Sequence, residues 1–510
     1  EDALYFGGNQ LWKTTDKGMN WKAISPDLTT NDPEKLKIPG GKLAVETSGA
    51  EIACIIVRLA ISKHNKGTIW VGTDDGQVQL TKNEGSSWTN VTPTSLPANS
   101  KILEVIESNH NPAHAYVVAT RLKGDDDRSP YIYKTEDYGA SWTNINGNFP
   151  ETEITRTICE DAVAPGLLWV GTETGIFTSK DDGQSWTRLD NGFPRVPVYH
   201  IVQKDEDLVV ASHGRGLWVL DDITPMRVLA DNSTQLIKPR NTHRFGYHWW
   251  QIYGGGVGGG QKNYFVQNHR PGHTFYELGM VNGEMKRKYI DAGDAKPNGV
   301  IIYYNLANAS EDTKLTIAET DGTEIISFEG DAISKNAGLN RFVWDMRYPN
   351  AKAIPGKPKP NVRPYCKPGK YRVKLSVNGE EQTQEFEVFM NPNETYTQAD
   401  ADARFALWME IRDKYSEVSE AIIEAQEIAK NTDDEAVKQA AKELEASMTA
   451  VGTTLVQIAN ERSKLLAKIQ GVGEMLISSE GPPSHGAKEA WADYEAAIDA
   501  ELAKWEAAKN

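Results

Sequence analysis

One eight-residue signature recurs four times before residue 190, and it restricts the fold of this chain more than any other feature. Each copy reads Ser or Thr, then Asp or Asn two positions later, Gly two positions after that, and Trp at the end. We call this signature the octet; its copies span residues 14–21, 81–88, 135–142 and 179–186. A short unit repeated in this way is typical of a β-propeller, in which each blade is a copy of one four-stranded sheet.

Each position of the octet has a local structural reason. The Asp or Asn side chain can accept backbone N–H bonds inside a tight turn, the Gly permits a positive φ, and the Trp packs against a neighbouring sheet. A turn carboxylate that is bonded to its own loop is not free to act on a substrate, so we assign these side chains a structural role. They are Asp16, Asn83, Asp137, Asp181, Trp21, Trp88, Trp142 and Trp186.

The strand patterns around the octets predict about five blades in residues 1–240. In the last unit the strands recur without an octet, and we expect residues 235–238 to form its fourth strand. The first unit opens on a second strand, so its innermost strand is missing. Because an incomplete fan leaves sheet faces and edges uncovered, we expect an N-terminal propeller segment or a separate chain to complete a ring of about seven blades.

The remaining sequence predicts a mainly β protein with an α-helical C-terminus. Residues 241–296 are a Gly-rich connecting region, and 297–391 alternate like a small immunoglobulin-like β-sandwich, interrupted by a proline-rich surface loop at 354–360. Residues 396–510 are helical and form a three-helix bundle, or a long hairpin plus one helix. Two capping boxes, Thr397 with Asp400 and Thr432 with Glu435, are expected to start helices.

Composition excludes several classes of partner and site. The formal net charge of −16 leaves no basic stripe for nucleic acid, and the chain has no apolar run near the ~20 residues of a transmembrane helix. Its three cysteines lie too far apart for a disulfide framework or a Cys-rich zinc site. We expect no cofactor and no metal, with one alternative: Asp125–Asp127 could hold calcium through oxygen ligands, or could be a solvated acidic loop.

An alignment of the innermost strands gives one candidate site. Arg58, Glu104, Thr157 and His200 fall in register, where they could line the central channel. Arg58 and Glu104 are expected to face one another across adjacent blades, either as a structural ion pair or as part of a catalytic site. The catalytic residues themselves stay unknown, because no set typical of a propeller sialidase or endoglucanase can be assigned.

Two further groups are candidates for ligand binding. His213 and Arg215 lie in a Ser-His-Gly-Arg-Gly turn that exposes the backbone; the alternative is a turn locked by hydrogen bonds from the arginine. Aromatic residues near the glycine run could stack on sugar rings, grip a peptide, or form a hydrophobic seam between ring and sandwich. These residues are Trp249, Trp250, Tyr253 and Tyr264.

The octets, the segment Leu168–Thr172 and above all the segment Ala211–Pro225 resemble those of bacterial BNR (Asp-box) repeat proteins. That family is often labelled glycosyl hydrolase and is related to the sortilin propellers. The resemblance also covers short motifs at 5–9, 24–28 and 369–373, and the second octet departs from it by having Asn83 for Asp. Members typically carry two tandem propellers, a sandwich and a helical tail, so this chain looks like the latter half of such a protein.

The resemblance implies a secreted, periplasmic or outer-surface location and a polysaccharide or polypeptide ligand. From it we expect an extracytoplasmic binding or scaffold protein of the cell envelope. The alternative is a glycoside hydrolase with its site in a cleft between two propellers. Two carboxyl groups facing each other roughly 5–10 Å apart would favour hydrolysis, whereas an aromatic groove would favour binding.

Overall fold

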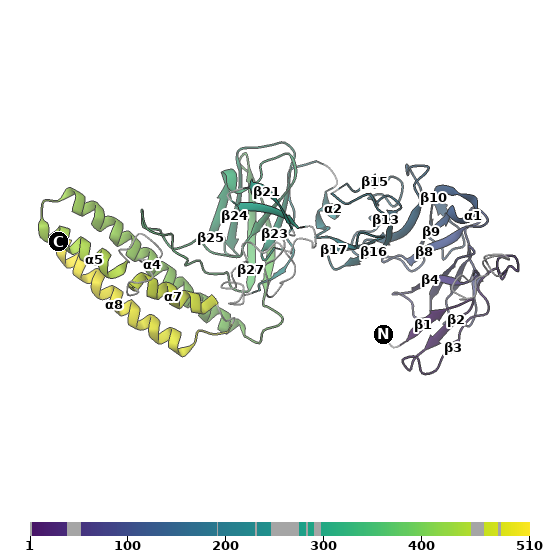
Figure 1. The fold of residues 1–510 in the computed structure, drawn as a ribbon, viewed down its shortest axis with the longest axis horizontal. Coiled ribbons are helices and arrows are strands. Elements are labelled where there is room, and N and C mark those ends of the chain that lie inside the picture. The colour runs from purple at the N-terminus through teal and green to yellow at the C-terminus, as the bar shows by residue number, and fades with distance from the viewer. Residues whose placement is uncertain are drawn as a thin grey trace. The chain divides into compact units, whose positions relative to one another are not determined.

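The structure is a computed structural model that describes residues 3–37, 53–190, 192–229, 232–245, 275–281, 284–289, 297–449, 464–477 and 481–509. The chain divides into two compact units, Glu1–Arg227 and Val228–Asn510. Unit 1 is built from β-sheets, and unit 2 combines sheets with the C-terminal helices (Figure 1). The predicted class, mainly β with a helical C-terminus, is confirmed.

Five antiparallel sheets follow one another through the described part of unit 1, and we call them blades 1 to 5 (Figure 1). Blade 1 contains β1 (Leu4–Gly7), β2 (Leu11–Thr14) and β3 (Lys22–Ala23). Blade 2 contains β4 (Ile56–Ile61), β5 (Ile69–Thr73), β6 (Val78–Thr81) and β7 (Thr89–Asn90). Blade 3 contains β8 (Lys101–Glu107), β9 (Ala115–Arg121), β10 (Asp127–Thr135) and β11 (Thr143–Asn144).

Blade 4 contains β12 (Thr155–Glu160), β13 (Leu168–Thr172), β14 (Ile176–Ser179) and β15 (Thr187–Arg188). Blade 5 contains β16 (Val198–Lys204), β17 (Asp207–Ser212) and β18 (Leu217–Leu220). Two short helices, α1 (Leu122–Asp125) and α2 (Thr224–Val228), complete the unit. The innermost strands β4, β8, β12 and β16 pack against one another in that order, which is the blade arrangement of a β-propeller.

The octets form the predicted turns. In the third octet the Asp137 carboxylate accepts the N–H of Ser141 at 2.8 Å and the hydroxyl of Thr135 at 2.9 Å, and Gly139 has φ +80°. Asn83 accepts the equivalent N–H from Ser87 at 2.8 Å with a neutral side chain. The turn therefore needs the acceptor oxygen and the left-handed glycine, and it forms without the negative charge.

Each later octet also binds the blade before it. The indole N–H of the octet Trp donates to a carbonyl that lies three residues beyond the Trp of the preceding octet. The pairs are Trp88 to Ile24 at 3.0 Å, Trp142 to Val91 at 2.7 Å and Trp186 to Ile145 at 2.9 Å. The octet Gly lies against the same residue, because a Cβ on Gly139 would come within 2.6 Å of the Cβ of Val91. We call this pair of interactions the octet contact.

The chain leaves the blades earlier than the sequence predicted. β19 (Gln235–Leu236) pairs with β23 (Val300–Leu306) of unit 2, with Leu236 opposite Tyr304. The expectation that residues 235–238 form the fourth strand of blade 5 is therefore wrong. Their alternation identified a strand but could not identify its partner, since the pairing spans about 70 residues of sequence.

Unit 2 contains two sheets packed on one core. The first has the order β19-β23-β26, with β26 at Gly338–Trp344. The second has the order β20-β28-β27-β24-β25, formed by Thr242–His243, Glu380–Phe389, Gly369–Val377, Thr313–Glu319 and Glu324–Glu329. Trp344 of the first sheet packs edge-on against Tyr371 and Phe386 of the second. A separate hairpin joins β21 (Phe275–Val281) to β22 (Glu284–Tyr289), and a 3-10 turn, η1, spans Gly330–Ala332.

Four helices lie in the part of the C-terminal region that the structure describes: α4 (Gln398–Asn431), α5 (Glu435–Met448), α7 (Leu465–Ile477) and α8 (His485–Lys509). The three-helix expectation is therefore wrong. The capping box of Thr397 with Asp400 is confirmed. The one at Thr432 is wrong, because Asp434 is the N-cap and its carboxylate accepts the N–H groups of Ala436 and Val437.

The sandwich and the helices pack together within unit 2. Tyr365 lies edge-on to Trp408 of α4, and Lys357 pairs with Glu445 of α5. The proline-rich segment 354–360 forms the predicted loop, and four of its seven residues are exposed, while its first residue, Ile354, is buried in the common core. No described helix combines the length and the apolar character needed to cross a membrane.

Candidate functional site

The innermost strands of blades 2 to 5 each carry a β-bulge at the same place. In each strand the pairing register shifts across one extra residue. The extra residues are Val57, Leu103, Arg156 and Tyr199. The residue after each bulge is one of the four that the sequence alignment placed in register: Arg58, Glu104, Thr157 and His200. A bulge changes the direction of the side chains beside it, so a bulge at one position in four blades marks this edge as a place where side chains are presented.

Glu104 joins these four residues into one cluster. Its buried carboxylate accepts a hydrogen bond from the Thr157 hydroxyl at 3.0 Å. The Arg58 Nε and the His200 Nδ1 each lie 3.4 Å from a Glu104 oxygen. Arg58 and Glu104 thus face one another across adjacent blades, as the sequence predicted, and His200 approaches the same carboxylate from blade 5. We call Arg58, Glu104, Thr157 and His200 the axial cluster.

Small residues on the second strands let the blades approach closely enough to form this cluster. Gly72 is paired with Arg58, and Gly171 is paired with Thr157. A Cβ on Gly72 would lie 2.5 Å from the Ile102 Cγ2, and one on Gly171 would lie 2.6 Å from the Val198 Cγ1. The first strand of each following blade therefore occupies the space of the absent side chain.

Two residues adjacent in sequence to the axial cluster, Arg156 and Tyr199, form a stack with His213. The Arg156 guanidinium lies 4.4 Å from the centre of the Tyr199 ring, and its Nε donates to Glu173 at 2.7 Å. Burial lowers the pKa of Arg156 below its usual value. The Tyr199 ring stacks on His213 with ring centres 5.0 Å apart. The sequence alignment missed Arg156 and Tyr199, although both directly precede residues that it selected.

The predicted Ser-His-Gly-Arg-Gly turn is closed mainly by its backbone and its serine. The Ser212 N–H and hydroxyl both donate to the Gly216 carbonyl, at 3.1 and 2.7 Å. Arg215 contributes its carbonyl, which accepts the Trp218 indole N–H at 3.0 Å, while its side chain is exposed. His213 therefore joins the aromatic pair next to the axial cluster, and Arg215 lies at the exposed tip of the turn.

The acidic loop uses its carboxylates in ion pairs. Asp125 and Asp127 both pair with Arg121, at 2.7 and 2.9 Å. A hydrogen bond from Tyr131, followed by one from the Ser129 backbone, lowers the pKa of Asp127 to about 2. Across the described ranges, no group of three or more His, Cys, Asp or Glu side chains is arranged to hold a metal ion.

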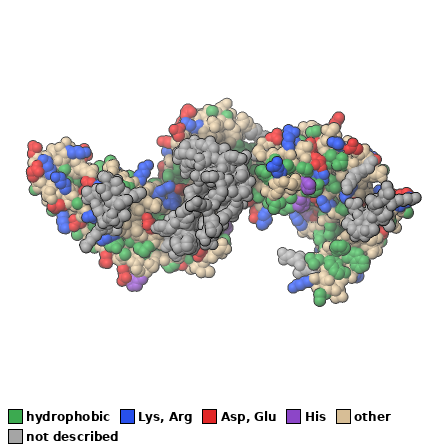
Figure 2. Space-filling model, in the orientation of Figure 1, with side chains coloured by type: hydrophobic (Ala, Val, Ile, Leu, Met, Phe, Trp, Pro, Cys, Tyr) green, Lys and Arg blue, Asp and Glu red, His purple; other side chains and the backbone are tan. Residues whose placement is uncertain are grey.

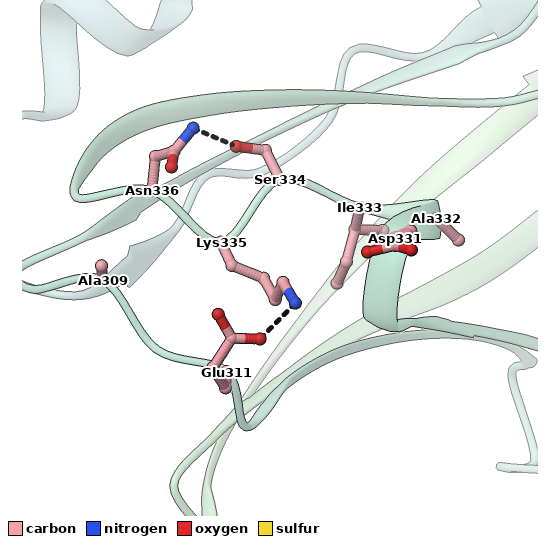
Figure 3. Close-up of a pocket in the computed structure, with 8 residues that line it drawn as sticks. All are labelled: Ala309, Glu311, Asp331, Ala332, Ile333, Ser334, Lys335 and Asn336. Atoms are coloured by element: carbon pink, nitrogen blue, oxygen red, sulfur yellow. Dashed lines mark hydrogen bonds and ion pairs between the residues drawn. The ribbon is translucent and has the colours of Figure 1, made fainter. Parts of the chain in front are cut away.

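Trp249, Trp250, Tyr253 and Tyr264 lie outside the described residues. Two hollows lie elsewhere in the described residues. One, of about 770 Å³, is a shallow polar depression of unit 2 in which Lys335 points toward Glu311 and Asn336 toward Ser334 (Figure 3). Another, of about 720 Å³, lies between the octet turns of blades 1 and 2. Neither is lined by the axial cluster.

The chemistry of the axial cluster differs from that of a glycosidase. Hydrolysis of a glycosidic bond uses two carboxyl groups, one as acid and the other as nucleophile or base. The axial cluster contains one carboxylate, and three neighbouring side chains already surround it. Its remaining chemistry is that of hydrogen-bond donors and cationic groups around a fixed anion.

No protein-family profile and no curated protein sequence matches this chain. Among solved structures it is similar to the GH74 xyloglucanase from Xanthomonas campestris, with a TM-score of 0.32 and 13% identity over 47% of this chain and 38% of that one. An ancestral GH74 enzyme gives a TM-score of 0.32 and 12% identity over 76% and 44%.

PorZ, a bacterial surface component of the type-IX secretion system of Porphyromonas gingivalis, gives a TM-score of 0.30 and 15% identity over 76% of this chain and 50% of that one. The chain thus spans between 38 and 50% of the length of these three proteins. Similarity at this level carries no argument about activity. The assignment of unit 1 as propeller blades depends on its own repeated sheets, bulges and octet contacts.

Proposed function

We propose that this chain is an extracytoplasmic binding or scaffold protein of the cell envelope, and that the axial cluster with its aromatic neighbours binds a polysaccharide or a polypeptide. We further propose that the chain belongs with the BNR (Asp-box) repeat proteins related to sortilin, and that the sandwich of unit 2 is immunoglobulin-like. The sequence motifs support both statements.

The observation that carries the proposal is the single carboxylate held by residues from three other blades. Arg58, Thr157 and His200 fix Glu104, so the remaining N–H groups of Arg58 and the Nε2 of His200 are pre-positioned for a ligand. His200 and Tyr199 are exposed, and the Tyr199 ring is held between Arg156 and His213. A guanidinium and an imidazole beside an aromatic ring suit a ligand with hydroxyl or carboxylate groups and an apolar face.

Ligand arrays test this proposal on the full chain. Glycan and peptide arrays should identify a ligand, and Glu104→Gln should weaken its binding about tenfold or more, because the change removes the charge that orients Arg58 and His200. Glu385→Gln is the matched control, since Glu385 pairs with Arg372 on the exposed surface of the sandwich. Unchanged binding by Glu104→Gln would contradict the site.

The same preparations should be assayed for reducing sugar. Release of reducing ends by the wild-type chain would favour the alternative, a glycoside hydrolase acting in a cleft between two propellers. Protease treatment of intact cells and of cells with a permeabilised outer membrane tests the extracytoplasmic location, and protection under both conditions would contradict it.

We also propose that further blades complete the ring, supplied by an N-terminal propeller segment or by a separate chain. The support comes from the exposed strand of blade 5. Leu217 on β18 is 76% exposed, whereas the third strands β6 and β14 are buried throughout. Within the described residues β18 pairs with β17 alone. An apolar strand with one free edge and an uncovered face is a site for a partner strand.

A further inference from the structure

The first octet has the same turn as the other three, but among the described residues no preceding blade contacts its Gly and Trp. Asp16 accepts the Asn20 N–H at 2.9 Å, and Gly18 has φ +93°. Trp21 is nevertheless 42% exposed, whereas Trp186 of the fourth octet is 4% exposed. Among the described residues, a Cβ on Gly18 would meet only the Trp21 ring, at 3.8 Å. The octet contact is thus preformed on one side and open on the other.

The residue that fills this space is of one kind in the other three blades. Ile24 lies against Gly85, Val91 against Gly139 and Ile145 against Gly183. All three residues are β-branched, and all three accept the indole N–H of the same octet. The first octet therefore presents a complementary surface for a β-branched residue whose carbonyl points at the Trp21 Nε1.

The adjoining strand is uncovered in the same direction. Gly7 occupies the position of Gly72, because a Cβ on either would meet the first strand of the next blade, at Ile56 or Ile102. Phe6 is thus equivalent to Val71, which is fully buried in a cluster with Leu11 and Leu28 of the preceding blade. Phe6 itself is 64% exposed. Hydrophobic side chains gather over β1–β3 in the space-filling view (Figure 2).

We infer that this surface, made of Leu4, Phe6, Gly18 and Trp21, docks a further octet-bearing blade. That blade places a β-branched residue on Gly18, and the carbonyl of this residue accepts a hydrogen bond from the Trp21 indole N–H. The partner residue lies three positions beyond the Trp of the partner's own octet. This inference depends on the proposed completion of the ring, and it specifies the sequence of the blade that meets blade 1.

A second copy of this chain does not fit the surface. Its residues Ile24, Val91 and Ile145 are already engaged by its own octets. The fourth equivalent position is Leu189, which is not β-branched and packs in the cluster shared by blades 4 and 5. The occupant is therefore a different polypeptide segment with an octet of its own.

The test is site-specific photo-crosslinking in the cells that make the protein. A benzophenone amino acid replaces Phe6, and the crosslinked peptide is sequenced by mass spectrometry. We expect the crosslinked peptide to contain an octet. The crosslink should lie either in the strand before that octet or a few residues after its Trp. These positions are equivalent to Leu11 and Leu28, which flank the first octet and pack in one cluster with the residue equivalent to Phe6 in blade 2. The same amino acid at the exposed Val163 in blade 4 is the control.

Three outcomes would overturn the inference: a crosslink to a second copy of this chain, a crosslink to a peptide without an octet, or no more crosslinking at position 6 than at position 163. Trp21→Phe should weaken association with the captured partner about tenfold, as expected for one lost buried hydrogen bond. Glu104→Gln should leave the crosslink intact. Ligand binding at the axial cluster is measured separately, so failure of one proposal is distinguishable from failure of the other.

Discussion

The octet contact makes a quantitative prediction for Trp186→Phe in blade 4. The Trp186 ring is buried, packs against Phe149 with ring centres 5.4 Å apart, and donates to Ile145 at 2.9 Å. Phenylalanine keeps an aromatic ring but has no N–H. The Ile145 carbonyl then stays buried without this donor, which costs about 1–3 kcal/mol. The smaller ring leaves part of the space empty, which adds about 1 kcal/mol.

We therefore expect Trp186→Phe to lower the free energy of unfolding of blade 4 by about 2–4 kcal/mol. Trp21→Phe is the matched control when the chain is measured without the blade proposed to dock on it, because the same octet position in blade 1 lacks the neighbouring carbonyl among the described residues. Its expected effect is below about 0.5 kcal/mol, as for a surface substitution.

Hydrogen-exchange mass spectrometry over a urea series measures both changes on the full chain. Peptides from β13 and β14 report blade 4, and peptides from β1 and β2 report blade 1, so the two units of the protein need not unfold together. Equal effects of the two substitutions, or a loss of less than about 0.5 kcal/mol for Trp186→Phe, would refute the octet contact as a stabilising interaction between blades.

Further predictions concern the turn, the acid limit of stability and the cysteines. Gly85→Ala should destabilise its blade by about 1–3 kcal/mol more than Gly18→Ala, and urea unfolding measures the difference. Both glycines have a positive φ, but only a Cβ at position 85 would meet a carbonyl, that of Ile24, at 2.1 Å. Hydrogen bonds from the Asn20 backbone N–H and then from the Thr14 hydroxyl lower the pKa of Asp16 to about 2 from 3.8, so the contribution of Asp16 to stability is present above about pH 4 and is lost as the pH falls toward 2. Asp16→Asn should therefore reduce the shift of the urea midpoint between pH 6 and pH 2, and an unchanged shift would contradict this. Burial raises the pKa of Cys159 and of Cys366 to about 12, so a thiol reagent at pH 8 should label neither in the native chain and both in urea. Rapid native labelling of Cys159 would contradict this for blade 4, and rapid native labelling of Cys366 would contradict it for the core of unit 2.

The sequence predicted the features that depend on local chemistry. The octet turns form as expected because a Thr or Ser, an acceptor side chain and a glycine close them within eight residues. The register of Arg58, Glu104, Thr157 and His200 was also accessible, since equivalent strands of a repeat present equivalent positions. Their convergence on one carboxylate follows from that register and from the close approach of the blades.

The sequence analysis missed features that depend on competition between two possible capping residues, or on pairing between strands that are distant in the sequence. Thr432 and Asp434 can both cap a helix, and the carboxylate at 434 accepts two backbone N–H groups, so α5 begins at Glu435 with Asp434 as its cap. Residues 235–238 alternate like a strand of either unit, and their partner lies in β23. The bulges were missed because an inserted apolar residue, such as Val57 or Leu103, does not change the apolar pattern of a strand. The inserted Arg156 and Tyr199 do interrupt their strand patterns, and that interruption was the available signal.

Comparison among the blades separates what the fold requires from what it permits. At the octet contact blades 2, 3 and 4 use the same chemistry, a left-handed glycine and a tryptophan donor against a β-branched residue, because that interface sets the distance between sheets. At the bulge the backbone is also the same in four blades, but the residues that follow are an arginine, a glutamate, a threonine and a histidine. A fold that tolerates four such different side chains at one position does not require any of them. We therefore propose that their assembly around Glu104 serves a ligand, and Glu104→Gln distinguishes this role from that of a structural ion pair, because only a ligand site loses ligand binding while the blades stay folded.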